Sequence, residues 1–151
     1  SHVTIGGIMD RLDRVTHDGR RLWRIVDYKT GGKTETTSTV RDLFDHRGLE
    51  HKHYMMQTFI YALILHELSP ITPMLPIAPT LFFVNHARNP SFTPYLKLGG
   101  EPLTDFARIA DDFREHLTRL IAEVLDPSRP FHPTDDTRTC TSCPYYALCY
   151  Q

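Results

Sequence analysis

Two aspartates and a lysine near the start of the chain have the types and the spacing needed for phosphate or metal chemistry. Asp27 and Lys29 lie in the stretch WRIVDYKTGG, which is otherwise typical of a buried strand, and Asp10 lies in the preceding apolar stretch IGGIMDRL. Asp18 and Gly19, between them, are the strongest short signal for a two-residue hairpin turn. A turn at this position pairs Asp10 directly with Asp27 across the hairpin.

The hairpin predicts that the two carboxylates share one face of the sheet. Side chains alternate along a strand, and directly opposed residues have Cβ atoms about 5 Å apart. Facing like charges destabilise a sheet, and burying them is costly unless they are compensated. Mg²⁺, which binds carboxylate, water and phosphate oxygens, would compensate them. On spacing alone, a metal site and a structural charge network explain the pair equally well.

Lys29 belongs to the same face, beside Asp27. Its ammonium could hold or activate a water or stabilise a pentacovalent phosphoryl transition state, or it could merely neutralise one aspartate. The same register pairs Asp13 with Arg24 on the opposite face. Asp13 is therefore expected to form an ordinary cross-strand ion pair rather than to bind a metal.

Hydrophobic periodicity predicts the elements that position these residues. It predicts strands over 3–15, 21–29 and 80–86, and segment 92–98 is expected to extend the last of these or to pair with it. It predicts helices over 52–68 and 103–125. The polar segment 30–50 is expected to be a mobile loop, and the proline-rich segment 69–79 a connector. This order predicts an α/β fold with a small mixed sheet flanked by helices.

The expected core combines strand residues with the apolar stripe of the last helix. Its members are Ile8, Leu12, Ile25, Val26 and Phe83, with Leu103, Phe106, Ile109, Ala110, Phe113, Leu117, Leu120, Ile121 and Val124.

The composition is that of an ordinary globular domain without a strong bias in charge. The chain has 151 residues, 40% of them hydrophobic and 23% charged, and a formal net charge of −1. This balance does not support strong non-specific nucleic-acid binding. Five arginines nevertheless cluster near the predicted turn, and a solvated hairpin face and a phosphate-facing surface explain them equally well: Arg11, Arg14, Arg20, Arg21 and Arg24.

Cysteine usage and hydropathy bear on location. All three cysteines lie in the last 12 residues. An odd number crowded at one end is a poor disulfide framework, so we expect a reducing, cytoplasmic compartment. No apolar run approaches the length of a membrane span, and we expect no membrane partner.

Four motifs resemble, in order and spacing, the signature of the PD-(D/E)XK nuclease superfamily, and specifically its RecB/AddB branch. GIMDRLDRV followed by WRIVDYKTG resembles the pattern G-x-x-D … D-Y/F-K-T/S-G, QTFIY resembles Q-x-x-x-Y, and CTSCPYYALC is similar to a C-x₂-C-x₅-C iron–sulfur tail. The resemblance spans nearly the whole chain and implies one restriction-endonuclease-like domain over 1–151, with 126–151 as a cysteine-bearing tail. The abrupt start in strand-like sequence suggests a truncated fragment of a longer protein, with the N-terminal part of the fold missing.

The resemblance implies roles for individual residues of the hairpin. Asp10 matches the first metal-binding aspartate, Asp27 the acid of the D-x-K pair and Lys29 its lysine. The main-chain carbonyl of Tyr28 would also face the metal.

The predicted helix 52–68 carries the next motif. Gln57 and Tyr61 match the residues that lie beside the active site and contact it or the DNA. Taken without the other motifs, they would more readily be the polar side of an amphipathic helix.

The implied reaction is Mg²⁺- or Mn²⁺-dependent hydrolysis of a DNA phosphodiester. The branch further implies exonuclease action on DNA ends with a helicase or motor partner, as in helicase–nuclease end processing and recombinational repair. An inactive nuclease-like fold that binds DNA or serves as an assembly scaffold is the alternative. A small zinc protein of unrelated fold would require the D-x-K match to be accidental.

The cysteine tail lacks one ligand. Cys140, Cys143 and Cys149 supply three thiolates, whereas a cluster or a zinc site takes four ligands. The resemblance implies a 4Fe–4S cluster in the full-length protein, with the fourth cysteine upstream of the nuclease motifs and absent here. A Cys₃His zinc site that includes His132 is the rival.

Overall fold

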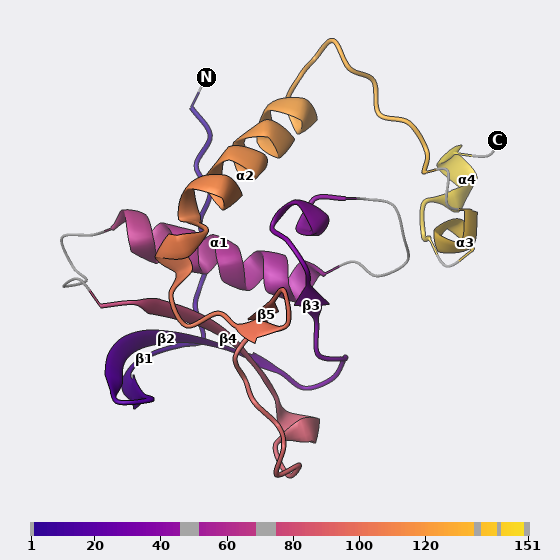
Figure 1. Cartoon of the computed structure of the whole chain (residues 1–151). Coiled ribbons are helices and arrows are strands. Elements are labelled where there is room, and N and C mark those ends of the chain that lie inside the picture. Colours follow the sequence, from indigo (N-terminus) through magenta and orange to yellow (C-terminus); the bar gives the residue numbers. More distant parts are fainter. Residues whose placement is uncertain (1, 46–51, 69–74, 135–136, 142, 150–151) are drawn as a thin grey trace.

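The computed structural model describes residues 2–45, 52–68, 75–134, 137–141 and 143–149. The strands are β1 (Arg11–His17), β2 (Arg20–Lys29), β3 (Thr36–Thr37), β4 (Ile77–Phe83), β5 (Lys97–Leu98) and β6 (Glu101–Pro102). One three-stranded sheet has the strand order β1-β2-β4, and a smaller one has the order β3-β5-β6. The helix α1 (His53–Glu67) crosses the larger sheet (Figure 1). The helices are α1 (His53–Glu67), α2 (Ala110–Val124), α3 (Thr137–Cys140) and α4 (Tyr146–Cys149), with 3₁₀ turns at Arg41–Leu43, Val84–His86 and Phe106–Arg108. The predicted α/β class is confirmed.

The β1–β2 hairpin has the predicted turn and register. Asp18 and Gly19 both have positive φ, 49° and 75°, as a tight two-residue turn requires. The ladder pairs Asp13 with Arg24 and ends at Arg11 opposite Val26. The expected strand over 3–15 is therefore wrong in its first half, because regular pairing begins only at Arg11.

β2 is the central strand of the larger sheet. It pairs antiparallel with β1 and parallel with β4, and α1 packs on β2 and β4. Ile25, Val26 and Phe83 are buried as predicted. Leu12 and Ile8 are 39% and 87% exposed, so their expected place in the core is wrong. Leu12 lies on the edge strand, which α1 does not cover, and Ile8 precedes the strand.

β4 begins earlier than the periodicity predicts. It covers Ile77–Phe83 and contains Pro79, which was expected to belong to the connector, and Val84–His86 forms a 3₁₀ turn instead of continuing the strand. Segment 92–98 pairs with β4 as expected, because Thr80 bridges Tyr95 and Leu81 N–H donates to Pro94 at 2.9 Å. Within the expected connector, residues 69–74 lie outside the described residues.

The two long helices build the core on one side of the sheet. α1 matches the predicted helix, whereas α2 begins at Ala110 rather than 103, because Asp105 caps a separate 3₁₀ turn through Ala107 N–H. Phe59, Phe106 and Phe113 pack edge to face between the helices. The expected stripe is buried at Leu103, Phe106, Ala110, Phe113 and Leu117, partly buried at Ile109, Leu120 and Ile121, and exposed at Val124.

The segment after β2 is more ordered than the expected loop. Its described part contains β3 and the turn Arg41–Leu43, and Val40 joins the core. Residues 46–50 of the expected loop lie outside the described residues. No helix in the described part of the chain is long and apolar enough to cross a membrane.

Candidate active site

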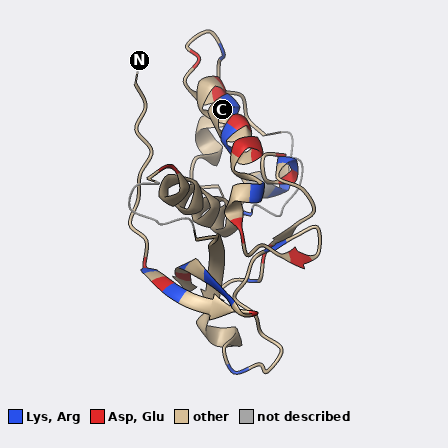
Figure 2. Cartoon of the chain, turned by 60° about the vertical axis from the view of Figure 1, so that its left-hand side comes forward, with Lys and Arg blue, Asp and Glu red and all other residues tan. Residues whose placement is uncertain are grey.

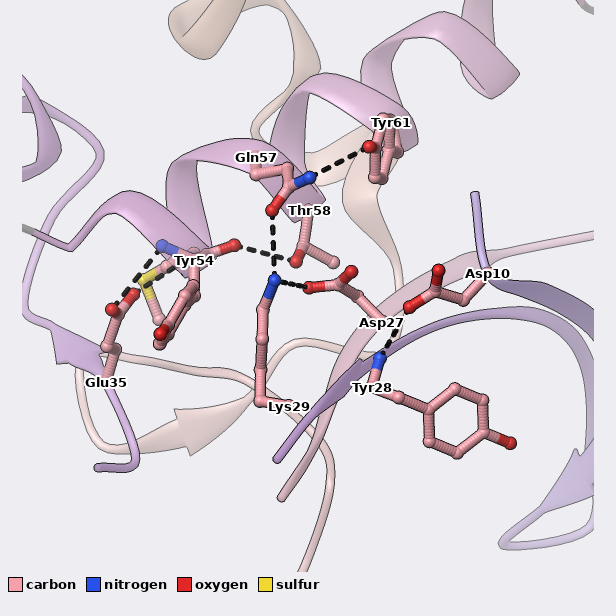
Figure 3. Close-up of polar contacts among 10 residues, drawn as sticks. Asp10, Asp27, Tyr28, Lys29, Glu35, Tyr54, Gln57, Thr58 and Tyr61 are labelled. Carbon is pink, nitrogen blue, oxygen red and sulfur yellow. Dashed lines mark hydrogen bonds and ion pairs between the residues drawn. The ribbon is translucent and has the colours of Figure 1, made fainter. Parts of the chain in front are cut away.

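The two aspartates of the hairpin meet at the end of the β1–β2 ladder. Asp27 is a strand residue with a side chain only 6% exposed, and it faces α1 with Ile25 and Lys29. Asp10 lies one residue before β1, where its Oδ2 accepts the N–H of Tyr28 at 2.9 Å. This contact turns the Asp10 carboxylate toward Asp27 (Figure 3).

The environment of Asp27 disfavours its charge. Burial raises the pKa of the Asp27 carboxyl, and Asp10 raises it further by charge repulsion and by a hydrogen bond to the protonated form. Lys29 opposes both effects through its contact and its charge. An additional cation beside the two carboxylates would relieve the cost of ionising Asp27.

Lys29 is held from two elements. Its Nζ lies 2.6 Å from Asp27 Oδ2 and donates to Gln57 Oε1 of α1 at 3.1 Å. It also lies 4.4 Å from the centroid of the Tyr54 ring, a cation–π contact. The ammonium is thus fixed between the sheet and the helix (Figure 3).

Gln57 and Tyr61 continue this network along α1. Gln57 Nε2 donates to Tyr61 Oη at 2.9 Å, and Tyr61 is 7% exposed. The pair faces the aspartates and not solvent, so it is not the polar side of a surface helix. The structure therefore brings together five residues of the sequence motifs: Asp10, Asp27, Lys29, Gln57 and Tyr61.

Gly7 connects the first motif to the helix motif. A Cβ at Gly7 would lie 2.7 Å from Tyr61 Cε1 and 3.1 Å from its Oη, whereas a Cβ at Gly6 would meet nothing within 4 Å. A side chain at position 7 would therefore force Tyr61 or the segment before β1 to shift. Gly7 is the glycine of the G-x-x-D pattern, so the sequence carried this signal.

Sequence reasoning missed two further residues beside Lys29. Tyr54, one turn before Gln57, places its ring against the ammonium. Glu35 accepts the N–H groups of Tyr54 and Met55 at the start of α1. The helical spacing of Tyr54 and Gln57 was a usable signal, whereas Glu35 lies in a polar segment without a pattern.

Tyr28 presents its amide and not its side chain to the aspartates. The ring is 40% exposed and packs edge-on against Phe82, with 5.6 Å between ring centroids. Figure 3 shows the Tyr28 ring pointing away from Lys29. The metal-facing role of the Tyr28 carbonyl stays a prediction.

The arginine cluster divides between the two faces of the hairpin. Asp13 forms ion pairs with both Arg11 and Arg24, with contacts of 2.6 Å and 2.8 Å. Arg14 and Arg21 are exposed, form no ion pair with described residues, and by alternation share the face of Asp10 and Asp27. Figure 2 shows Lys and Arg residues, in blue, at several places along the hairpin.

The cysteines lie far from this site. α3 and α4, which carry Cys140 and Cys149, lie at the end of an extended segment that leaves α2 (Figure 1). Cys140 is buried, Cys143 half-buried and Cys149 exposed. Within the described ranges, no three His, Cys, Asp or Glu side chains are grouped to hold a metal.

The residues at the hairpin fit a hard divalent cation with few protein ligands. Asp27 Oδ2 is buried, and although Lys29 lies close, no described donor is aligned with it as a hydrogen bond. Asp10 adds a second carboxylate. Mg²⁺ often takes one or two carboxylates and completes its shell with water and phosphate oxygens, which suits this pair. The three thiols, in contrast, do not form a cluster site among the described residues.

Comparison with known proteins agrees with this geometry. A sequence model of the PD-(D/E)XK nuclease superfamily matches residues 1–150. No curated protein and no solved structure matches the chain. The match covers nearly the whole chain, and the mixed α/β architecture is that of a restriction-endonuclease-like fold. The chain belongs to the PD-(D/E)XK nuclease superfamily.

Proposed function

We propose that this chain is a Mg²⁺- or Mn²⁺-dependent DNA nuclease domain that acts as an exonuclease. One observation carries the proposal: the Asp10 and Asp27 carboxylates face each other while Lys29 is held between Asp27 and Gln57. A structural charge network would need only one lysine against one aspartate. It would not explain a second carboxylate that raises the pKa of the first.

Each residue of the group has a separate task in the proposed reaction. Asp10 and Asp27 would hold the cation, which supplies stabilisation for the negative charge that develops on the phosphate. Lys29 would position the attacking water or stabilise the same charge, because its ammonium is fixed at the edge of the carboxylate pair. Gln57 and Tyr61 keep that ammonium aligned through their hydrogen bonds.

DNA is the proposed substrate, and the hairpin arginines support it. Arg14 and Arg21 are exposed on the face that carries the aspartates and are free of ion pairs with described residues. Exposed guanidinium groups bind phosphate oxygens well. A strand of DNA that follows this face would meet both arginines on its way to Asp10 and Asp27.

The RecB/AddB assignment and its biological setting form part of the proposal. Its support is the order of the G-x-x-D, D-Y-K-T-G, Q-x-x-x-Y and C-x₂-C-x₅-C patterns along one chain. That branch implies an ATP-driven helicase or motor partner and DNA end processing in recombinational repair. The proposed cytoplasmic location rests instead on the three cysteines, which make a poor disulfide framework.

The 4Fe–4S proposal for Cys140, Cys143 and Cys149 is supported by their spacing alone. Such a cluster takes a fourth ligand in addition to these three cysteines. Anaerobically purified full-length protein, which would supply the fourth cysteine, should be brown and absorb visible light. A colourless preparation that contains zinc would favour the Cys₃His alternative with His132.

A nuclease assay with linear and closed circular DNA tests the central proposal. Wild-type protein with Mg²⁺ should degrade linear DNA and leave closed circles intact. Asp27→Asn and Lys29→Ala should each lower the rate at least about 100-fold. Asp13→Asn, on the opposite face of the same hairpin, is the matched control and should retain activity. Equal digestion by Asp27→Asn, Lys29→Ala and wild type would refute the site. Cleaved circles would refute exonuclease action, and DNA binding without cleavage in Mg²⁺ or Mn²⁺ would favour the scaffold alternative.

A further inference from the structure

Glu35 is a half-buried acid that the proposed reaction does not use. Its Oε2 accepts the N–H of Met55 at 2.7 Å and its Oε1 accepts the N–H of Tyr54 at 3.4 Å. Both donors lie in the first turn of α1, where backbone N–H groups lack partners inside the helix. Burial raises the pKa of the Glu35 carboxyl, although the two N–H donors, His53 and Lys29 oppose the shift.

The start of α1 lacks a cap of its own. Lys52 occupies the N-cap position without a side-chain capping hydrogen bond, and the first turn contains no acidic residue. Glu35 supplies both the acceptor and the negative charge from the segment that follows β2. A carboxylate at this position also interacts favourably with the helix dipole.

The start of α1, whose first turn Glu35 holds, carries the contacts to Lys29. The Tyr54 ring lies 4.4 Å from the ammonium, and Gln57 Oε1 accepts from it at 3.1 Å. The ring is confined on its other sides, because a Cβ at Gly32, whose φ is 103°, would lie 3.0 Å from Tyr54 Cε2. Phe83 packs edge-on against the same ring. A shift of the first turn would therefore move the surroundings of the ammonium.

We propose that Glu35 is a positioning residue, which fixes the Lys29 ammonium by capping the first turn of α1 and so holding Tyr54 and Gln57 against it. The proposal rests on the proposed nuclease function for its catalytic consequence. It assigns Glu35 no contact with substrate or metal. Its action passes from the carboxylate to the helix turn and from the turn to the lysine.

Glu35→Gln is the primary test, because it keeps the size of the side chain but replaces one acceptor oxygen with an N–H₂ donor. Asp105→Asn is the matched control: Asp105 accepts Ala107 N–H at 3.1 Å, the same kind of cap, on an element that does not touch Lys29. The first measurement is amide hydrogen exchange at Tyr54 and Met55. The second is the nuclear Overhauser effect between the Lys29 side chain and the Tyr54 ring.

The third measurement is steady-state kinetics with Mg²⁺ and linear DNA. The assay is run well below the melting temperature of each variant. Glu35→Gln should speed exchange about tenfold and weaken the Lys29–Tyr54 effect. It should also lower kcat about tenfold with KM within about twofold. Asp105→Asn should leave all three at wild-type values. The double variant Glu35→Gln/Gln57→Ala should lose less kcat than the product of the two single losses, because both changes act on the same ammonium, that of Lys29.

Two results would overturn the proposal. The first is a Glu35→Gln protein in which amide hydrogen exchange, the Overhauser effect between Lys29 and Tyr54, and kcat are all the same as in wild type. The second is a protein whose melting temperature falls while kcat and the Lys29–Tyr54 effect stay normal, since Glu35 would then stabilise the fold alone. If wild type does not cleave DNA, the nuclease proposal fails, and the exchange and Overhauser measurements decide the role of Glu35 by themselves. Glu35→Asp, which withdraws the carboxylate by one methylene, replaces Glu35→Gln if that variant does not fold.

Discussion

A methyl group added at Gly7 should disturb Lys29 through three successive contacts. The new Cβ would lie 2.7 Å from Tyr61 Cε1, and Tyr61 is 7% exposed, so the ring has little room to move. Tyr61 Oη accepts from Gln57 at 2.9 Å, and Gln57 in turn accepts from Lys29 at 3.1 Å. Displacement of the ring should therefore reach the ammonium.

The size of the effect follows from the overlap. Carbon atoms in contact lie about 3.5–4.0 Å apart, so the ring or the segment before β1 must shift by about 1 Å. Overpacking of this kind costs about 1–3 kcal/mol. For a domain of this length, each 1 kcal/mol corresponds to about 2–4 °C in Tm. Gly7→Ala should thus lower Tm by several degrees and slow DNA cleavage.

Gly6→Ala is the matched control, because a Cβ there meets nothing within 4 Å. It should leave cleavage unchanged and alter stability by at most about 1 kcal/mol through the unfolded chain. Thermal unfolding and digestion of linear DNA compare the two variants. In a Tyr61→Ala background, Gly7→Ala should cost little, because the overlapping ring is gone. Equal Tm and rate for Gly7→Ala and Gly6→Ala would refute the packing of this segment on α1 and, with it, the placement of Asp10.

Three further predictions follow from the charges at the site. The raised pKa of Asp27 gives the folded protein stability that is present below the ordinary carboxyl pKa of about 3.9 and is lost as the pH rises through the raised value. In EDTA, the Tm of Asp27→Asn should therefore exceed that of wild type, and the difference in Tm should grow with pH in calorimetric scans. A difference in Tm that does not change with pH would contradict the burial of this charge. The double variant Arg14→Ser/Arg21→Ser should bind DNA more weakly than wild type. In fluorescence titrations, the slope of log K against log salt should become shallower by about 0.7–0.9 per lost phosphate contact. Arg20→Ser, on the other face, should have little effect, and equal losses of binding in the two proteins would rule out the proposed DNA path. Tyr54→Leu should lower kcat more than Tyr54→Phe, which keeps the ring beside Lys29, and equal rates would show that the cation–π contact is unimportant for catalysis.

Local patterns were sufficient for much of the fold. The Asp18-Gly19 turn determined the β1–β2 register, because a two-residue turn leaves one pairing of the flanking residues, and Asp13 meets Arg24 as that pairing requires. The spacing of apolar residues located α1 to within a residue or two of its ends. These features depend on contacts between residues close in sequence.

Errors arose where distant parts of the chain decide burial and where a cap separates an apolar stripe into two elements. Leu12 has the alternation of a core residue but is 39% exposed, because it lies on the edge strand beyond the reach of α1. The apolar stripe begins at Leu103, yet the helix begins at Ala110, because Asp105 caps a separate turn. The first outcome depends on distant contacts. The second has a local cause, the hydrogen bond from Ala107 N–H to Asp105, which hydrophobic periodicity does not detect.

By itself, the sequence predicted which residues lie together: the hairpin register indicated Asp10, Asp27 and Lys29, and the motif that resembles Q-x-x-x-Y added Gln57 and Tyr61. Only the tertiary structure decided how they are held. The close approach of Gly7 to Tyr61 and the capping of α1 by Glu35 join segments 54 and 20 residues apart in the chain. Such contacts exist only after helix and sheet have packed, because no short-range pattern of residue types encodes which distant backbone will lie within hydrogen-bonding or van der Waals distance.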